Sequence, residues 1–184
     1  MTPRIPPVPA QGNRPDVQAL IDQATASTGG AQNVFLTMAH HPGLLRRYLP
    51  FAGKLLNGGK LPARDRELVI LRTAWLCRSD YEWGQHVRIG RDAGLDDDEI
   101  ARVVHGPDAP GWTPGEAALL RACDELVTRH RVEPSTWAEL EGRYDRRQLL
   151  ELTVLPGSYA MLAAMLNTVG VEREAGVEGL PDEP

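Results

Sequence analysis

Helix-start signals recur along this chain of 184 residues, and strand signals are nearly absent. In a capping box, a Ser, Thr or Asp at the helix start is followed three residues later by Glu or Gln. Four segments fit that pattern, beginning at Ser79, Asp96, Thr113 and Asp145. Apolar residues then recur at helical spacing. The fold class predicted is therefore all-α, a helical bundle with helices near 16–27, 42–57, 62–78, 80–93, 97–104, 114–130, 134–142 and 146–168.

The last predicted helix contains Pro156 and Gly157. A proline inside a helix costs about 3 kcal/mol, so we expect a kink or a break there. Small residues follow, and they would let another helix approach closely, either in the core or at a subunit interface. These are Ser158, Ala160, Ala163 and Ala164.

Length and composition predict one soluble domain. We expect a Pro-rich arm over 1–14, a single helical domain over 15–173 and a polar tail over 174–184. The net charge of −5 argues against nucleic acid and anionic lipid as partners. The N-terminus lacks the apolar core of a signal peptide, and the apolar stretch 149–169 is interrupted by polar residues and proline. A cytoplasmic protein with no membrane partner is expected.

The two cysteines, Cys77 and Cys123, lie 46 residues apart and form no CxxC motif. That spacing fits neither a zinc site nor a thioredoxin-like site. Each is interpreted as a small buried apolar residue.

The segment from Leu61 to Leu95 carries the candidate chemistry. Glu82 and His86 are four residues apart, hence on one face of a helix. Glu67 lies on the preceding helix and reaches that face if the two helices pack antiparallel. Two carboxylates around one imidazole form a plausible proton-transfer site, because histidine titrates near neutral pH.

Each of these residues also has an ordinary structural interpretation. Glu82 could only close the capping box that begins at Ser79, and His86 could be a half-buried histidine with its hydrogen bonds satisfied. Glu67 could interact with the positive end of the helix dipole or lie on a solvent-exposed face. Residue chemistry alone leaves both interpretations open.

A helix that begins Arg66-Glu67-Leu68-Val69, followed by Tyr81-Glu82-Trp83 with His86 and by the stop Gly94-Leu95, resembles the core of the carboxymuconolactone decarboxylase family and its alkylhydroperoxidase D-like relatives. In the peroxidase-type members, CxxC comes 12 residues after a glutamate, and a histidine lies four residues beyond the second cysteine. This chain keeps that frame with Glu67 and His86. It has Ser79 and Glu82 where the cysteines would be.

The resemblance implies an oligomeric alkylhydroperoxidase D-like bundle and a cofactor-independent carboxy-lyase or isomerase that acts on an activated acid or lactone. It implies His86 as general acid, Glu67 as its orienting partner and Glu82 as a second proton carrier, with no cofactor and no metal. The substrate is expected to be a small molecule, possibly anionic, and the chain a dimer, trimer or hexamer. Ser79, Tyr81 and Trp83 would line the pocket, although Trp83 could equally pack in the core. The cation for an anionic substrate would be Arg72, Arg78 or Arg88.

Two alternatives stay open. One is a thiol peroxidase of the same fold that uses Cys77, which serine and glutamate at the CxxC positions disfavour. The other is a non-catalytic helical oligomer.

A faint internal repeat pairs Arg66-Glu67-Leu68-Val69 with Arg147-Gln148-Leu149-Leu150. Asn167 follows Gln148 at the same 19-residue spacing by which His86 follows Glu67. A duplication of this kind would keep the helix pair in the second copy and lose its titratable groups.

Overall fold

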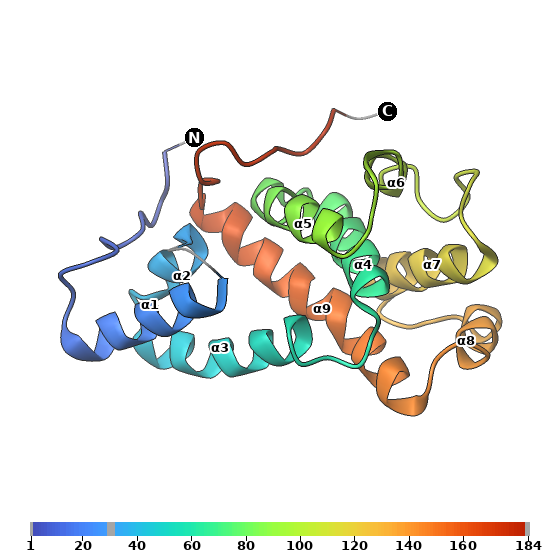
Figure 1. Cartoon of the computed structure of the whole chain (residues 1–184), viewed down its shortest axis with the longest axis horizontal. Coiled ribbons are helices and arrows are strands. Elements are labelled where there is room, and N and C mark those ends of the chain that lie inside the picture. Colours follow the sequence, from blue (N-terminus) through green and yellow to red (C-terminus); the bar gives the residue numbers. More distant parts are fainter. Residues whose placement is uncertain (1, 29–31, 183–184) are drawn as a thin grey trace.

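The computed structural model describes residues 2–28 and 32–182, which contain nine α-helices and no strand (Figure 1). In chain order these are α1 (Pro15–Thr28), α2 (Asn33–Met38), α3 (Pro42–Leu56), α4 (Ala63–Leu76), α5 (Asp80–Asp92), α6 (Asp97–Val103), α7 (Pro114–Arg129), α8 (Pro134–Glu141) and α9 (Arg146–Val169).

The all-α prediction is confirmed, and each of the eight predicted helices ends within two residues of its expected limits. Helix α2 was missed. It has only six residues, and the side chain of its first flanking residue, Gln32, makes no capping hydrogen bond. No start signal therefore marks it in the sequence.

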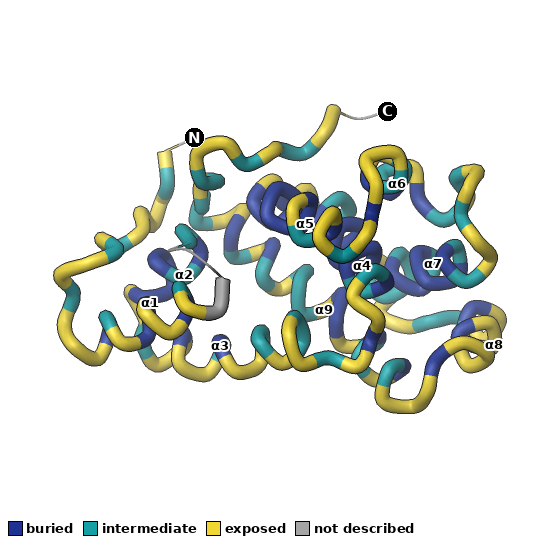
Figure 2. Tube along the Cα trace, in the orientation of Figure 1, coloured by how far each residue is buried: buried dark blue, intermediate teal, exposed yellow. Residues whose placement is uncertain are grey.

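The helices enclose two clusters of buried apolar side chains. The smaller cluster joins α1, α2 and α3, which gather at one end of the molecule in Figure 1. The larger cluster surrounds α4, where Leu68 to Leu71 are fully buried, and receives side chains from α5, α7 and α9. Figure 2 shows the same contrast, with α4 and α5 largely buried and α3 largely exposed along its outer side. The candidate site lies between these two clusters.

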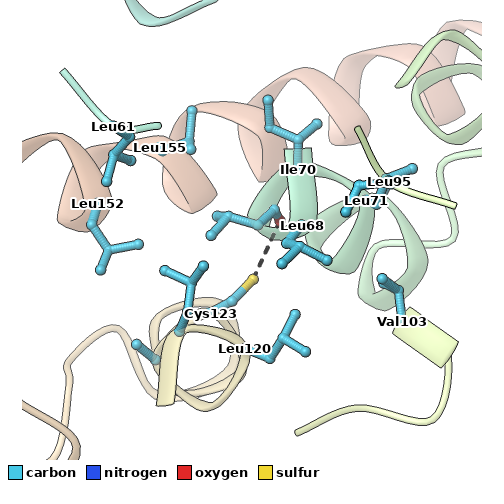
Figure 3. Close-up of a cluster of buried hydrophobic side chains, with 14 of the residues drawn as sticks. Leu61, Leu68, Ile70, Leu71, Leu95, Val103, Leu120, Cys123, Leu152 and Leu155 are labelled. Atoms are coloured by element: carbon cyan, nitrogen blue, oxygen red, sulfur yellow. Dashed lines mark hydrogen bonds between the residues drawn. The ribbon is translucent and has the colours of Figure 1, made fainter. Parts of the chain in front are cut away.

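Cys123 is a fully buried member of the larger cluster, as expected, and lies beside Leu68 and Leu120 (Figure 3). Its Sγ donates to the carbonyl of Val69 at 3.5 Å. Burial raises the pKa of this thiol to about 12. Cys77 is only half-buried, which differs from the expectation.

A kink or a break was expected at Pro156, and the break is absent, because α9 runs without interruption from Arg146 to Val169. Pro156 is buried, and Leu152 and Leu155 beside it belong to the larger core cluster. Core packing at and just before the proline therefore outweighs its local cost. By length and composition the helix is also long and apolar enough to cross a membrane, and in this structure it contacts α4, α5, α7 and α8.

Both terminal segments lie against the helices of the same chain. The backbone N–H of Arg4 donates to Val169 O at 2.7 Å, and that of Val8 donates to Leu36 O at 3.2 Å. At the other end, Glu174 accepts a hydrogen bond from the backbone N–H of Asn33, and Leu180 packs on the larger cluster.

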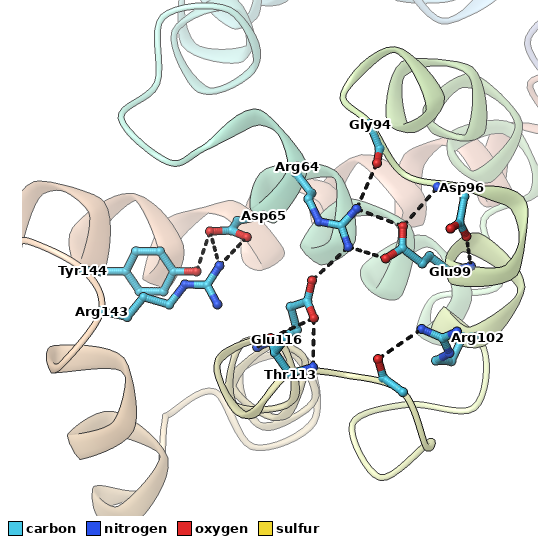
Figure 4. A network of polar contacts seen from close by, with 11 residues as sticks. Arg64, Asp65, Gly94, Asp96, Glu99, Arg102, Thr113, Glu116, Arg143 and Tyr144 are labelled. Carbon is cyan, nitrogen blue, oxygen red and sulfur yellow. Dashed lines mark hydrogen bonds and ion pairs between the residues drawn. The ribbon is translucent and has the colours of Figure 1, made fainter.

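A buried polar network anchors the start of α4 (Figure 4). Asp65 accepts two hydrogen bonds from Arg143 at 2.8 and 2.9 Å and one from the Tyr144 hydroxyl at 2.7 Å. Arg64 bonds to Glu99 and Glu116 in the same region. Every carboxylate in this network has a donor, so its burial is compensated.

Candidate active site

A tight turn folds α5 back along α4. Arg78 adopts a left-handed backbone conformation with φ 52°, and the N–H of Ser79 donates to the carbonyl of Ala74 at 2.8 Å. These features end α4 and reverse the chain within three residues. The two helices then pack together, as the proton-transfer hypothesis requires.

Glu67 and His86 meet across this helix pair. The distance from His86 Nδ1 to Glu67 Oε2 is 2.6 Å, and the two residues are 6% and 0% exposed. Arg66 Nε donates to the other oxygen of Glu67 at 2.7 Å. Burial alone would raise the pKa of Glu67, but the charge of His86 and the hydrogen bonds from His86 and Arg66 outweigh it and hold that pKa below its usual value. Glu67 is therefore a carboxylate at neutral pH.

That carboxylate determines which nitrogen of His86 is free. An ionised oxygen accepts a hydrogen bond from the N–H at Nδ1, which leaves Nε2 without a hydrogen-bond partner among the described residues. His86 also lines the main cavity. The imidazole is thus oriented by Glu67 and can exchange a proton with a ligand in that cavity.

Glu82 lies one turn before His86 and has no such partner. The capping box expected from Ser79 to Glu82 is absent, because the Ser79 side chain makes no capping hydrogen bond. Within the described residues, the Ser79 hydroxyl and both carboxyl oxygens of Glu82 are buried and without a hydrogen-bond partner. Burial raises the pKa of Glu82 to about 8, opposed only in part by the nearby Ser79 hydroxyl. Glu82 therefore holds its proton at neutral pH.

Glu82 and His86 both line a cavity of about 460 Å³. Its walls come from α2, α3, α4, α5 and α9, and they combine apolar side chains with a few polar ones. The Tyr159 ring meets the His86 ring edge-on, with the centroids 5.1 Å apart and the planes at 85°. The lining residues are Gln32, Val34, Phe35, Tyr48, Ala52, Leu56, Asn57, Arg66, Tyr81, Glu82, Gln85, His86, Arg88, Ile89, Asp92, Tyr159 and Leu162.

The other predicted pocket residues divide between cavity and core. Tyr81 lines the cavity, but its hydroxyl is committed, donating to Glu174 at 2.9 Å and accepting from the backbone N–H of Val34 at 3.3 Å. Trp83 does not line the cavity; it packs in the larger core cluster edge-on to Trp75. Ser79 lies buried at the start of α5, outside the cavity lining.

Of the three arginines considered for an anionic substrate, only Arg88 lines the cavity. Arg72 is buried and bonded to Asp124 at 2.7 and 2.9 Å, and Arg78 lies over the Trp75 ring. Arg66 lines the cavity too, and it was missed because it reads as one of several charged residues at a helix start.

Tyr48 and Tyr159 were also missed, since they stand on helices far from the recognisable segment. The faint repeat gave no help, because its second half lies within the single helix α9 and does not form a helix pair. Only tertiary packing brings these tyrosines to His86. Among the residues that the structure describes, no three His, Cys, Asp or Glu side chains gather as a metal site would require.

Three solved structures share this fold. A peroxidase-related protein with the alkylhydroperoxidase AhpD core from Ralstonia eutropha JMP134 is 20% identical, with a TM-score of 0.78 over 93% of each chain. A peroxidase-related protein from Silicibacter sp. TM1040 is 15% identical, with a TM-score of 0.81 over 96% of each chain. A cysteine variant of the debrominase Bmp8, in complex with 2,3,4-tribromopyrrole, is 13% identical, with a TM-score of 0.78 over 93% of this chain and 91% of that one.

No curated protein matches the sequence significantly. The carboxymuconolactone decarboxylase family matches residues 42–125, the segment that carries Glu67, Glu82 and His86. Over nearly its whole length the chain has the fold of the alkylhydroperoxidase D-like proteins, and the segment that matches the carboxymuconolactone decarboxylase family lies within that fold.

Proposed function

We propose that this protein is a cofactor-independent enzyme that decarboxylates or isomerises an activated carboxylic acid or lactone by proton transfer. The observation that carries the proposal is the buried carboxyl group of Glu82, which has no hydrogen-bond partner among the described residues and lines the same cavity as His86, the partner of Glu67. A buried carboxyl group without a partner costs stability, so a role in chemistry accounts for its presence.

In a decarboxylation, the bond between the substrate carbon and its carboxylate breaks and CO₂ leaves. The electron pair moves into a conjugated carbonyl and forms an enolate. His86 then delivers a proton from Nε2 to carbon, while the Glu67 carboxylate stabilises the charged imidazole. Glu82 holds a second proton that can replace the one His86 has given.

An isomerisation uses the same two proton carriers. Neutral His86 removes a proton from carbon, and protonated Glu82 returns one at another position of the conjugated system. The decarboxylation needs one group that delivers a proton to carbon, and the isomerisation as written uses two acid–base groups at one cavity, which Glu82 and His86 supply.

Positive charge at the cavity fits a small anionic substrate. Arg66 is half-buried and Arg88 is exposed, and both line the cavity. The lining also includes Asp92, which limits the local positive charge. Arg88 has no ion-pair partner among the described residues and is the better candidate for a substrate carboxylate.

The thiol-peroxidase alternative has less support. Burial and the charge of Glu82 raise the pKa of Cys77, and Cys123 is fully buried. A peroxide-reducing cysteine requires an accessible thiol with a lowered pKa. Neither thiol meets that requirement.

The test is solvent deuterium incorporation, followed by proton NMR in D₂O over a panel of β-keto acids and unsaturated lactones. Wild type is expected to place deuterium on carbon in at least one compound. His86→Ala and Glu82→Gln are each expected to slow that reaction by about 10²- to 10⁴-fold, because each removes one acid–base group.

His105→Ala is the matched control, since His105 is an exposed histidine outside the cavity lining. It should react at the wild-type rate. Wild-type rates in both His86→Ala and Glu82→Gln would exclude the proposed proton carriers.

A further inference from the structure

We infer that the hydroxyl groups of Tyr48 and Tyr159, together with the carboxyl group of Glu82, form an oxyanion-binding site for the enolate or phenolate oxygen of a ligand. The inference rests on the proposed function and narrows its substrate class. It implies that the reacting group is conjugated to a carbonyl oxygen that becomes negatively charged, and that neutral donors, not a metal or an arginine, bind that oxygen.

The three groups reach one cavity from three helices. Tyr48 comes from α3, Glu82 from α5 and Tyr159 from α9, and all three line the space beside His86. Neither Tyr48 nor Tyr159 uses its hydroxyl in a hydrogen bond within the described residues. Hydroxyls of tyrosines at a cavity usually find a partner, so two uncommitted ones point to a ligand.

Tyr81 provides the contrast within the same cavity. Its hydroxyl is engaged on both sides, by Glu174 and by the backbone of α2. The cavity therefore holds one tyrosine whose hydroxyl is structural and two whose hydroxyls remain available.

All three groups stay protonated at neutral pH. Burial, and then the charge of Glu82, raises the pKa of Tyr48 above its usual value. Burial also raises the pKa of Tyr159, followed by the charges of Glu67, Tyr48 and Glu82. All three groups line the same cavity, so one ligand there can meet more than one of them. Neutral donors held in a site with little water stabilise a developing negative charge without needing to reorganise.

The position of Tyr159 joins this site to the proton carrier. Its ring packs against His86 with the centroids 5.1 Å apart, so a ligand held by the Tyr159 hydroxyl also lies beside the imidazole. The apolar side chains of Phe35, Leu56 and Leu162 also line the cavity and suit a planar conjugated ligand.

The test uses 4-nitrophenol, whose phenolate absorbs visible light and mimics an enolate oxygen. Wild type is expected to bind it as the phenolate and to lower the pKa of the bound probe. Tyr48→Phe and Tyr159→Phe should each weaken phenolate binding by about 10- to 100-fold, the effect of losing a hydrogen bond to a charged group. His105→Ala, the control, should bind within about twofold of wild type, because His105 is exposed and lies outside the cavity lining.

The inference fails if wild type does not bind the probe, if it binds only the neutral phenol, or if both Phe variants bind the phenolate as wild type does. The wild-type result stands even if a variant does not fold. His86→Ala separates the two proposals, because it should lose deuterium incorporation and keep phenolate binding. If wild type incorporates no deuterium but phenolate binding still requires both tyrosines, the proposed function is wrong and the oxyanion site stands.

Discussion

Two buried carboxyl groups, one near the start of α4 and one near the start of α5, have opposite surroundings. Asp65, at the start of α4, is 2% exposed and accepts hydrogen bonds from Arg143 and Tyr144. Glu82, near the start of α5, is equally buried, and within the described residues neither of its oxygens has a hydrogen-bond partner. The first carboxylate stabilises the fold where α4 meets the connection between α8 and α9. The second destabilises it and faces a cavity. A buried acid therefore indicates function here through its missing partners, not through its burial.

The largest expected effect is the loss of stability when Asp65, the carboxylate with hydrogen-bond donors, is replaced. Asp65→Ala should lower the free energy of unfolding by about 3 kcal/mol or more, because it leaves Arg143 and the Tyr144 hydroxyl without their acceptor. Urea denaturation measures the change. Asp145→Ala is not a suitable control, since Asp145 caps α9. Asp98→Ala, at an exposed position on α6, should change stability by less than about 0.5 kcal/mol. Equal losses in both variants would remove the special role of Asp65.

Glu82, whose carboxyl group has no hydrogen-bond partner among the described residues, should lower the free energy of unfolding, by an amount that depends on pH. Folded Glu82 keeps its proton up to about pH 8, whereas the unfolded chain loses it near pH 4.5. Between these values the folded state binds more protons than the unfolded state. The Glu82 contribution to the free energy of unfolding therefore falls as pH rises, by up to about 1.4 kcal/mol per pH unit, and levels off above pH 8.

Glu82→Gln removes this titration, so the variant should gain stability relative to wild type across that pH window. Denaturation of both proteins at several pH values measures the difference. A difference that does not change with pH would mean that Glu82 is not a buried protonated acid.

A smaller effect is expected where the C-terminal segment crosses α5. A Cβ added at Gly84 would lie 2.2 Å from Glu178 O and 2.5 Å from Val177 Cγ1, too close for the segment to keep its place. Gly84→Ala should therefore speed hydrogen exchange over residues 171–182 and lower the melting temperature.

Gly157→Ala is the matched control in α9. No atom lies within 4 Å of its added Cβ, so helix propensity should stabilise the protein by up to about 1 kcal/mol. Unchanged exchange of the C-terminal segment in Gly84→Ala would contradict the observed packing.

The smallest effect is expected from the thiols. Replacing Cys77 and Cys123 together by serine should leave deuterium incorporation within about twofold of wild type, because neither thiol has the lowered pKa of a reactive cysteine. The same protein should consume peroxide no faster or slower than wild type. A loss of peroxide consumption in the variant would instead favour the thiol mechanism.

Local signals predicted the helices well because caps and apolar periodicity act over a few residues. The capping boxes at Asp96, Thr113 and Asp145 all form. The same pattern at Ser79 and Glu82 does not form, although the helix still begins there. Whether a capping box forms depends on the tertiary surroundings of its side chains as well as on the local sequence. Those surroundings cannot be predicted from four residues.

The site was predictable only where its members lie on neighbouring helices. The spacing of Glu82 and His86, and the short turn before them, placed Glu67 within reach, and the structure joins Glu67 to His86 at 2.6 Å. Tyr48 and Tyr159 carry no local signal, because their roles depend on how α3 and α9 pack around α5. The same limit explains why Trp83, next to Glu82 in sequence, lies in the core.

The sequence by itself determined the helical class and most helix limits, and it placed Glu67 and His86 on neighbouring helices, because each of these depends on residues near one another along the chain. Only the tertiary structure decided that α9 continues through Pro156, that the C-terminal segment packs on α5 and that Glu82 is buried without a partner. These outcomes depend on burial, and burial depends on what distant segments cover. The proton affinity of Glu82, and the chemistry proposed for it, therefore follow from the fold as a whole.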